Sequence, residues 1–270
     1  NSDVEHDFTS DPISLLRDGE WLTADGTTLG ADNGIGVATA LALLEIEEDT
    51  KLPPLECLFT VDEETGLTGA FALDGNLLQG RTMLNLDTEE WGAICIGCAG
   101  GGDSQISLPV SYEGAPGDFL SFQLAVEGLK GGHSGVDIHE YRANAIVLLA
   151  SVMVPLTEMG VRIVSVQGGD KTNAIPREAF ATLLLPPEAM ADAQIAVAGR
   201  MESLRSEYGS LEKDMRVSLV GLEDAPAECM SAEAQGNLMG LLRTLPHGVL
   251  KYSHTIPGLV ETSKIGRAHV

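Results

Sequence analysis

Hydrophobic residues follow two different patterns along the chain, and the pattern changes near residue 100. Before that point, short apolar runs at 55–61, 81–86 and 93–98 each lead into polar or glycine-rich sequence. Near-continuous apolar runs of this length are typical of strands buried on both faces. The clearest helical pattern covers 34–48, so strands and helices alternate here. This alternation predicts an α/β layer.

After the glycine run at 100–102 the pattern changes, and the segment 118–126 shows clean alternation of apolar and polar residues. Strands are predicted over 118–126, 161–167, 178–185 and 215–220, and helices over 138–153, 188–208 and 231–243. The first of these helices would turn Tyr141, Leu148 and Val152 toward the core. The resulting order β-α-β-β-α-β is that of a ferredoxin-like fold.

We therefore expect a partial α/β catalytic domain at 1–102 and an α+β ferredoxin-like domain at 103–264. A small hairpin is expected around 19–28, where glycine and aspartate mark turns. Residues 265–270 match one reading frame of a sequencing adapter, so we treat them as a non-native tail and leave His269 out of the ligand candidates. With no initial methionine, the chain is expected to be an internal piece of a longer protein.

Composition excludes several kinds of partner. Sixteen basic residues against 40 acidic ones give a formal charge of −24, which disfavours nucleic acid and anionic membranes. No signal peptide or membrane-spanning run is visible. Cys95 and Cys98 form a CxxC without a second pair, so buried structural thiols are expected instead of a zinc site. A reducing cytoplasm fits this cysteine usage best.

Four acidic residues lie at three junctions between the predicted elements of the first domain. Asp32 precedes the helix at 34–48, Glu63 and Glu64 follow the first strand, and Asp87 follows the second. Ligands collect at the carboxyl ends of strands in open α/β sheets, so these carboxylates predict a metal site there. The plainer alternatives are a helix cap at Asp32 and a solvated acidic loop at 63–64.

Three further candidates lie in loops of the second domain. His133, in the sequence Gly131-Gly132-His133-Ser134-Gly135, could polarise a substrate carbonyl, or simply be exposed in a helix-capping loop. Asn173 and Arg177 join two strands, either as an ordinary turn or as an amide donor and a guanidinium fork for a substrate carboxylate.

Taken together, these segments resemble a known family. The chain resembles the cytosolic aminoacyl-histidine (Xaa-His) dipeptidases of the M20 di-zinc metallopeptidases. The resemblance covers the chain up to about Ser263 and rests on the motifs at 1–8, 26–36, 53–56, 59–66, 84–87, 97–101, 131–135 and 173–177.

The resemblance implies a catalytic domain of the phosphorylase/hydrolase-like type with an inserted lid that takes part in dimerisation. Asp32 would bridge two Zn²⁺ ions, which Co²⁺ or Mn²⁺ could replace, and the peptide bond after it would be cis. Glu63 would be the general base, with Glu64 and Asp87 as terminal metal ligands. In the lid, His133 would assist substrate binding or the oxyanion, while Asn173 and Arg177 would contact a small peptide substrate.

Two parts of the family pattern are missing. The family's His-x-Asp motif would precede Asn1, and its last metal-binding histidine would lie beyond residue 264. A zinc site without both imidazoles should bind weakly. We therefore expect the parent protein to be a dipeptidase, and the 270-residue chain by itself to be inactive.

The function expected for the parent is metal-dependent hydrolysis of dipeptides with C-terminal histidine, in the cytoplasm and as a homodimer. One alternative is another M20-type di-zinc aminopeptidase or amidohydrolase with a different substrate. The other is a non-catalytic relative in which the lid serves only as an oligomerisation module.

Overall fold

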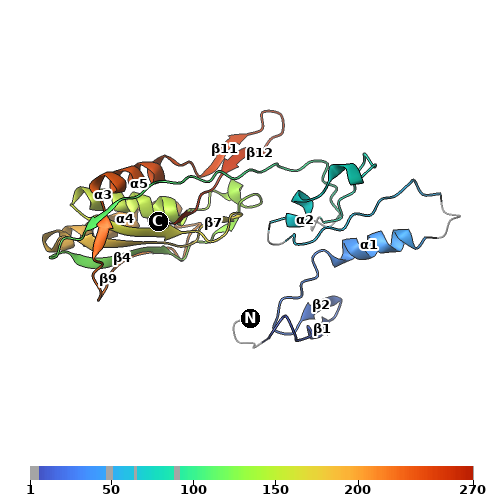
Figure 1. The fold of residues 1–270 in the computed structure, drawn as a ribbon, viewed down its shortest axis with the longest axis horizontal. Helices are drawn as coiled ribbons and strands as arrows, with labels where there is room; N and C mark the ends of the chain where they lie inside the picture. Colours follow the sequence, from blue (N-terminus) through green and yellow to red (C-terminus); the bar gives the residue numbers. More distant parts are fainter. Residues whose placement is uncertain (1–5, 47–50, 64–65, 88–91, 270) are drawn as a thin grey trace. The chain divides into compact units, whose positions relative to one another are not determined.

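The structure, a computed structural model, describes residues 6–46, 51–63, 66–87 and 92–269. The chain divides into two compact units, Asn1–Cys98 and Ala99–Val270. Figure 1 draws both units, and each is described below by itself.

The second unit is built on a five-stranded sheet with strand order β13-β6-β8-β4-β9. Its strands are β4 (Leu120–Glu127), β6 (Arg162–Gly168), β8 (Ala179–Leu185), β9 (Arg216–Gly221) and β13 (Ala268–His269). All four pairings are antiparallel. Leu124 on β4 lies opposite Ala181 on β8 and opposite Leu219 on β9. Leaving β13 aside, the order of the four strands is the one that the β-α-β-β-α-β pattern requires.

Helices α3 (Ala145–Glu158) and α4 (Met190–Tyr208) lie against this sheet, together with α5 (Ala232–Thr244), as Figure 1 shows. Burial of their apolar faces against the strands removes one large cluster of hydrophobic side chains from water. Among the largest fully buried side chains are Leu124, Leu149, Met153, Leu156, Ile163, Leu183, Leu185, Leu204 and Leu238. The core of the molecule therefore lies in the second unit.

Helix α3 begins seven residues later than the sequence pattern predicts. Residues 138–140 form a 3₁₀ turn, η2, and Tyr141 has a positive φ of 56°, which an α-helix cannot contain. The helix starts after Asn144, whose side-chain oxygen accepts from the N–H of Ile146 at 2.9 Å. The prediction that Tyr141 faces the core is wrong, because it is 62% exposed.

Short strands complete the second unit. They are β3 (Tyr112–Gly114) paired with β10 (Glu228–Met230), β5 (Gly132–His133) paired with β7 (Ala174–Ile175), and β11 (Gly248–Tyr252) paired with β12 (Val260–Lys264); a 3₁₀ turn, η3 (Pro187–Ala189), precedes α4. Within the segment 265–269, two residues join the five-stranded sheet. Ala268 and His269 pair with Gly168 and Gln167, since the edge of β6 offers free backbone groups.

The first unit contains a hairpin and short helices. Its elements are β1 (Leu15–Asp18), β2 (Trp21–Ala24), α1 (Gly34–Leu44), α2 (Thr68–Phe71) and the 3₁₀ turn η1 (Gly75–Leu77). The expected hairpin is present, although its turn lies at residues 19–20 and its strands begin earlier than predicted. Helix α1 is capped by Asn33, whose side-chain oxygen accepts from the N–H of Gly36 at 2.9 Å.

The three strands expected at 55–61, 81–86 and 93–98 are not formed in the described residues. A strand requires a neighbour for its backbone N–H and C=O groups, and no ladder is made with these segments in the described part. Their apolar side chains stay exposed, up to 83% for Leu84 and 100% for Ile96. The prediction of buried thiols in the last segment is wrong for the same reason, since Cys95 and Cys98 are exposed.

Candidate functional site

The described acidic candidates of the first unit, Asp32, Glu63 and Asp87, lie outside its helices and strands. Asp32 comes directly before the helix cap, and its peptide bond to Asn33 is cis, as the family resemblance implies. The side-chain amide of Asn33 donates to the carbonyl of Leu86 at 2.7 Å, across 53 residues of sequence. Since Asp87 follows Leu86 directly, this bond holds the backbone of Asp32 and of Asp87 close to one another.

Two other contacts tie the segment before Glu63 to the rest of the unit. The thiol of Cys57 lies 3.7 Å from the carbonyl of Ala40 on α1. The Glu56 carboxylate accepts from the N–H groups of Gln79 and Gly80, at 3.0 and 2.5 Å. These donors hold the pKa of Glu56 below its ordinary value, because they favour the charged carboxylate.

Glu63 lies at the start of a tight turn. Its carbonyl accepts from the N–H groups of Gly66 and Leu67, at 3.1 and 2.9 Å, while Thr68 contacts Asp62 through backbone and side chain. Gly69 allows the turn to close, since a Cβ there would lie 2.5 Å from the carbonyl oxygen of Val61. Glu64 lies outside the described residues.

A metal site needs ligands that converge. Within the described ranges, no three His, Cys, Asp or Glu side chains are grouped so as to hold an ion. Carboxylates such as Asp32 and Asp87 have suitable donor chemistry for a divalent ion, and the structure holds their backbones together. The donor chemistry therefore fits a metal, whereas the described residues do not supply a complete ligand set.

The three candidates of the second unit are brought together by the β5–β7 ladder. His133 pairs with Ala174, next to Asn173, and Gly132 pairs with Ile175. The N–H of Ser134 donates to the carbonyl of Asn173 at 2.8 Å, and the N–H of Leu129 to that of Arg177 at 3.4 Å. The loop at 128–135 thus lies along the segment 173–177, and the His133, Asn173 and Arg177 residues are all exposed.

The double glycine of this loop is required by close packing. Gly131 has a φ of +63°, and a Cβ there would collide with the Arg177 side chain. Gly132 has a φ of +141°, and a Cβ there would collide with Arg142 and lie 2.6 Å from Asp137 Oδ2. The glycines therefore let two arginines approach the loop that carries His133.

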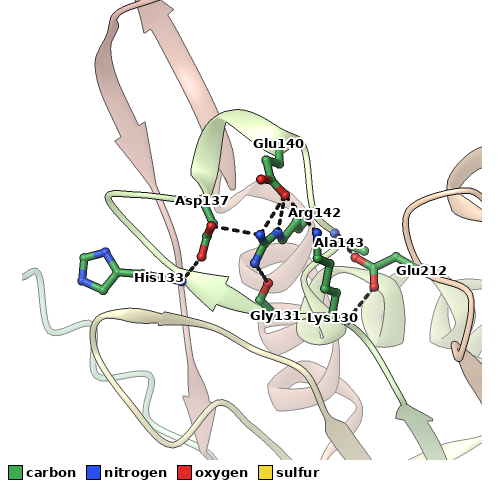
Figure 2. Close-up of polar contacts among 8 residues, drawn as sticks. All are labelled: Lys130, Gly131, His133, Asp137, Glu140, Arg142, Ala143 and Glu212. Carbon is green, nitrogen blue, oxygen red and sulfur yellow. Dashed lines mark hydrogen bonds and ion pairs between the residues drawn. The ribbon is translucent and has the colours of Figure 1, made fainter. Parts of the chain in front are cut away.

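Arg142, which the sequence reasoning missed, is the centre of a polar network that contacts that loop (Figure 2). Its guanidinium contacts Asp137 Oδ1 at 2.9 Å, Glu140 Oε2 at 2.7 Å and the carbonyl of Gly131 at 2.6 Å. It holds the pKa of Glu140 below its ordinary value. Residues 137–142 do not form an α-helix, so no helical periodicity relates Asp137, Glu140 and Arg142. The only signal in the sequence was the pair of glycines at 131–132, which indicates a close contact of the backbone.

Comparisons with known proteins agree with the resemblance drawn from the motifs. Residues 124–209, which include the second half of β4 and all of α3, β6, β8 and α4, match the model of the peptidase dimerisation domain of the M20 family. This part of the second unit is therefore similar to an M20 dimerisation domain. The match lies within the part of the chain predicted to be the lid.

Two relatives extend the similarity to both units. The chain is 43% identical to the cytosol non-specific dipeptidase of Escherichia coli (strain K12), over 97% of its own length and 54% of that protein. It is 41% identical to the aminoacylhistidine dipeptidase of Vibrio alginolyticus, whose crystal structure matches with a TM-score of 0.73 over 97% of this chain and 54% of that one. An uncharacterised protein of Bacillus subtilis is 27% identical, over 75% of the chain and 53% of that protein.

The resemblance to the M20 dipeptidases is therefore confirmed. The chain spans about half the length of the first two relatives. Among the described residues, no helix combines the length and hydropathy needed to cross a membrane.

Proposed function

We propose that this chain supplies catalytic and substrate-binding residues of a metal-dependent dipeptidase that accepts dipeptides with C-terminal histidine. The observation that carries the proposal is the 43% identity to a named dipeptidase, which runs through both units and not through the dimerisation domain alone. The cytoplasmic location and the homodimer belong to the same proposal, supported by the name of that relative and by the dimerisation domain.

In this proposal the first unit carries the reaction centre. Asp32, Glu64 and Asp87 would hold divalent ions, Zn²⁺ first and Co²⁺ or Mn²⁺ as substitutes. A bound ion of this kind acts as a Lewis acid and lowers the pKa of water. The hydrogen bond from Asn33 to Leu86 supports the pairing of Asp32 with Asp87.

Glu63 would act as the general base. A carboxylate that accepts the proton of the attacking water can pass it to the leaving amine, so one group serves both halves of the reaction. Its backbone carbonyl is held by two N–H groups of the following turn, which supports a fixed position for the residue.

The second unit would bind the substrate. Arg177 offers a planar fork for the dipeptide carboxylate, and Asn173 offers an amide donor for a peptide oxygen. In a chain of charge −24, an exposed arginine beside His133 is a preferred place for an anion. The β5–β7 ladder supports a joint role, because it brings these three residues together.

The proposal is tested with a chimera in which residues 1–264 replace the equivalent region of the Escherichia coli relative. We expect it to hydrolyse dipeptides, and to lose activity on chelation and regain it with Zn²⁺. Arg177→Met should raise KM, whereas Arg216→Met, an exposed arginine on β9, should not. A chimera that folds and binds metal yet cleaves no dipeptide of a broad panel would refute the proposal.

A further inference from the structure

The ring of His133 is oriented by its own loop. Its Nδ1 accepts from the backbone N–H groups of Gly135 and Val136, at 3.1 and 3.2 Å. A backbone amide can only donate, so Nδ1 carries no proton in this arrangement. The proton of the neutral ring must then reside on Nε2, which makes Nε2 a hydrogen-bond donor.

Asp137 fixes the backbone on which that ring is mounted. Its Oδ2 accepts from the N–H of His133 at 2.7 Å, and its own N–H donates to the carbonyl of His133 at 2.9 Å. Its other oxygen, Oδ1, accepts from Arg142 at 2.9 Å, so the carboxylate is held from the opposite side (Figure 2).

Arg142 contacts the loop at two points. Its side chain is only 11% exposed, and its guanidinium reaches Asp137 and the carbonyl of Gly131 at the same time. One cation therefore contacts the loop on both sides of Gly132. Lysine would keep the charge but not the planar fork, so it could not make these contacts together.

The segment 130–143, which includes His133, Asp137 and Arg142, is held at its two ends by another residue. Glu212, which is 3% exposed, accepts from the N–H of Lys130 at 2.6 Å and from that of Ala143 at 2.9 Å. Because Glu212 holds the segment 130–143 at both ends, loss of the Arg142 guanidinium should disturb residues 131–137 without releasing the segment from the unit.

We propose that the Asp137–Arg142 pair is a positioning device that holds His133 with Nδ1 as acceptor, so that Nε2–H is presented as a donor to an oxygen of the ligand. The device acts through His133 and touches no substrate itself. The nature of the ligand rests on the proposed function, whereas the orientation of the ring can be measured in the 270-residue chain without it.

The first test is amide hydrogen exchange in the 270-residue chain, read by NMR at Gly135 and Val136. Arg142→Lys should make both amides exchange on the order of tenfold faster, as expected when a charge-assisted hydrogen bond is lost. Arg162→Lys is the matched control, because Arg162 also contacts a carboxylate and a carbonyl, those of Glu113 and Met230, away from this loop. Unchanged exchange in Arg142→Lys would overturn the proposal.

The second test reads the ring itself. Correlation of imidazole nitrogen and carbon-bound proton signals should identify Nε2–H as the tautomer of His133, assigned by comparison with His133→Gln. His254, an exposed histidine between β11 and β12, is the reference for a ring on the surface. Asp137→Asn should shift the His133 signals toward those of His254, while Arg162→Lys should not. A ring with its proton on Nδ1, or one that ignores Asp137→Asn, would contradict the positioning role.

The third test connects the device to hydrolysis in the chimera. His133→Gln and Arg142→Lys should each reduce kcat/KM, and the double variant should be no worse than His133→Gln alone, because both changes remove the same donor. Additive losses would overturn the claim that Arg142 acts through His133. An inactive parent chimera would refute the proposed function and leave the exchange and tautomer results to decide the positioning role.

Discussion

Replacement of Glu212 by glutamine should measurably destabilise the second unit. The carboxylate is buried and accepts from the backbone amides of Lys130 and Ala143, the two ends of the segment 130–143. Glutamine keeps one acceptor oxygen but turns an NH₂ group toward the other amide, so one buried donor loses its partner. An unpaired buried donor costs about 1–3 kcal/mol.

The assay is urea denaturation of the 270-residue chain followed by far-UV circular dichroism, which reports the helices and strands of the second unit. With a dependence on urea of about 1–3 kcal/mol per molar, the midpoint should fall by roughly 1 M. Glu202→Gln on α4, an exposed change of the same chemistry, should leave it in place. Equal midpoints for the two variants would refute the assignment of Glu212 as an anchor.

Three further predictions concern the second unit. Burial lowers the pKa of His247 below its ordinary value, because it disfavours the charged ring. The neutral ring therefore contributes to folding stability above a pH of about 6.5, and this contribution is lost as the pH falls. The urea midpoint should drop less between about pH 8 and about pH 5.5 in His247→Gln than in the parent. Leu183→Ala, at a fully buried position of β8, should cost about 2–5 kcal/mol in urea denaturation, whereas Leu222→Ala, at a 40% exposed position, should cost far less. Asn144→Ala should cost about 1–2 kcal/mol by removing the cap of α3, and a loss no larger than that of Leu222→Ala would contradict the capping role.

The second unit could be predicted well because the apolar faces of its helices and strands pack against one another. The strands over 118–126 and 178–185 appear as β4 and β8 within two residues of their expected bounds, and Leu124 and Leu183 bury as the alternation requires. Periodicity reports which face of a segment is apolar, and here the partner faces lie within the same unit.

The same reasoning failed in the first unit because it assumed partners for every apolar run. Residues 55–61 and 81–86 have the composition of buried strands, yet the described chain offers no ladder for them. Local pattern specifies what a segment could bury, but a strand also depends on a neighbour for its backbone. The start of α1 at Gly34 was predicted correctly, although Asn33 and not Asp32 supplies the capping oxygen.

For the candidate site, sequence could name His133, Asn173 and Arg177 but could not relate them geometrically. Their proximity comes from the register of two-residue strands, which no periodicity encodes. The contribution of Arg142 depends on a left-handed turn at Tyr141 and on Gly132, which leaves space for its side chain. The roles proposed for Asp32, Glu63 and Asp87 stay predictions from the resemblance.

The measurement that tests the central claim most directly is dipeptide hydrolysis by the chimera and by its Glu63→Gln variant, with metal content determined on the same samples. Glu20→Gln, in the turn between β1 and β2, is the matched control. We expect Glu63→Gln to lose about 10²- to 10⁴-fold in kcat while its metal content stays that of the parent, as for a missing general base. Equal activity of Glu63→Gln and the parent chimera would contradict the account.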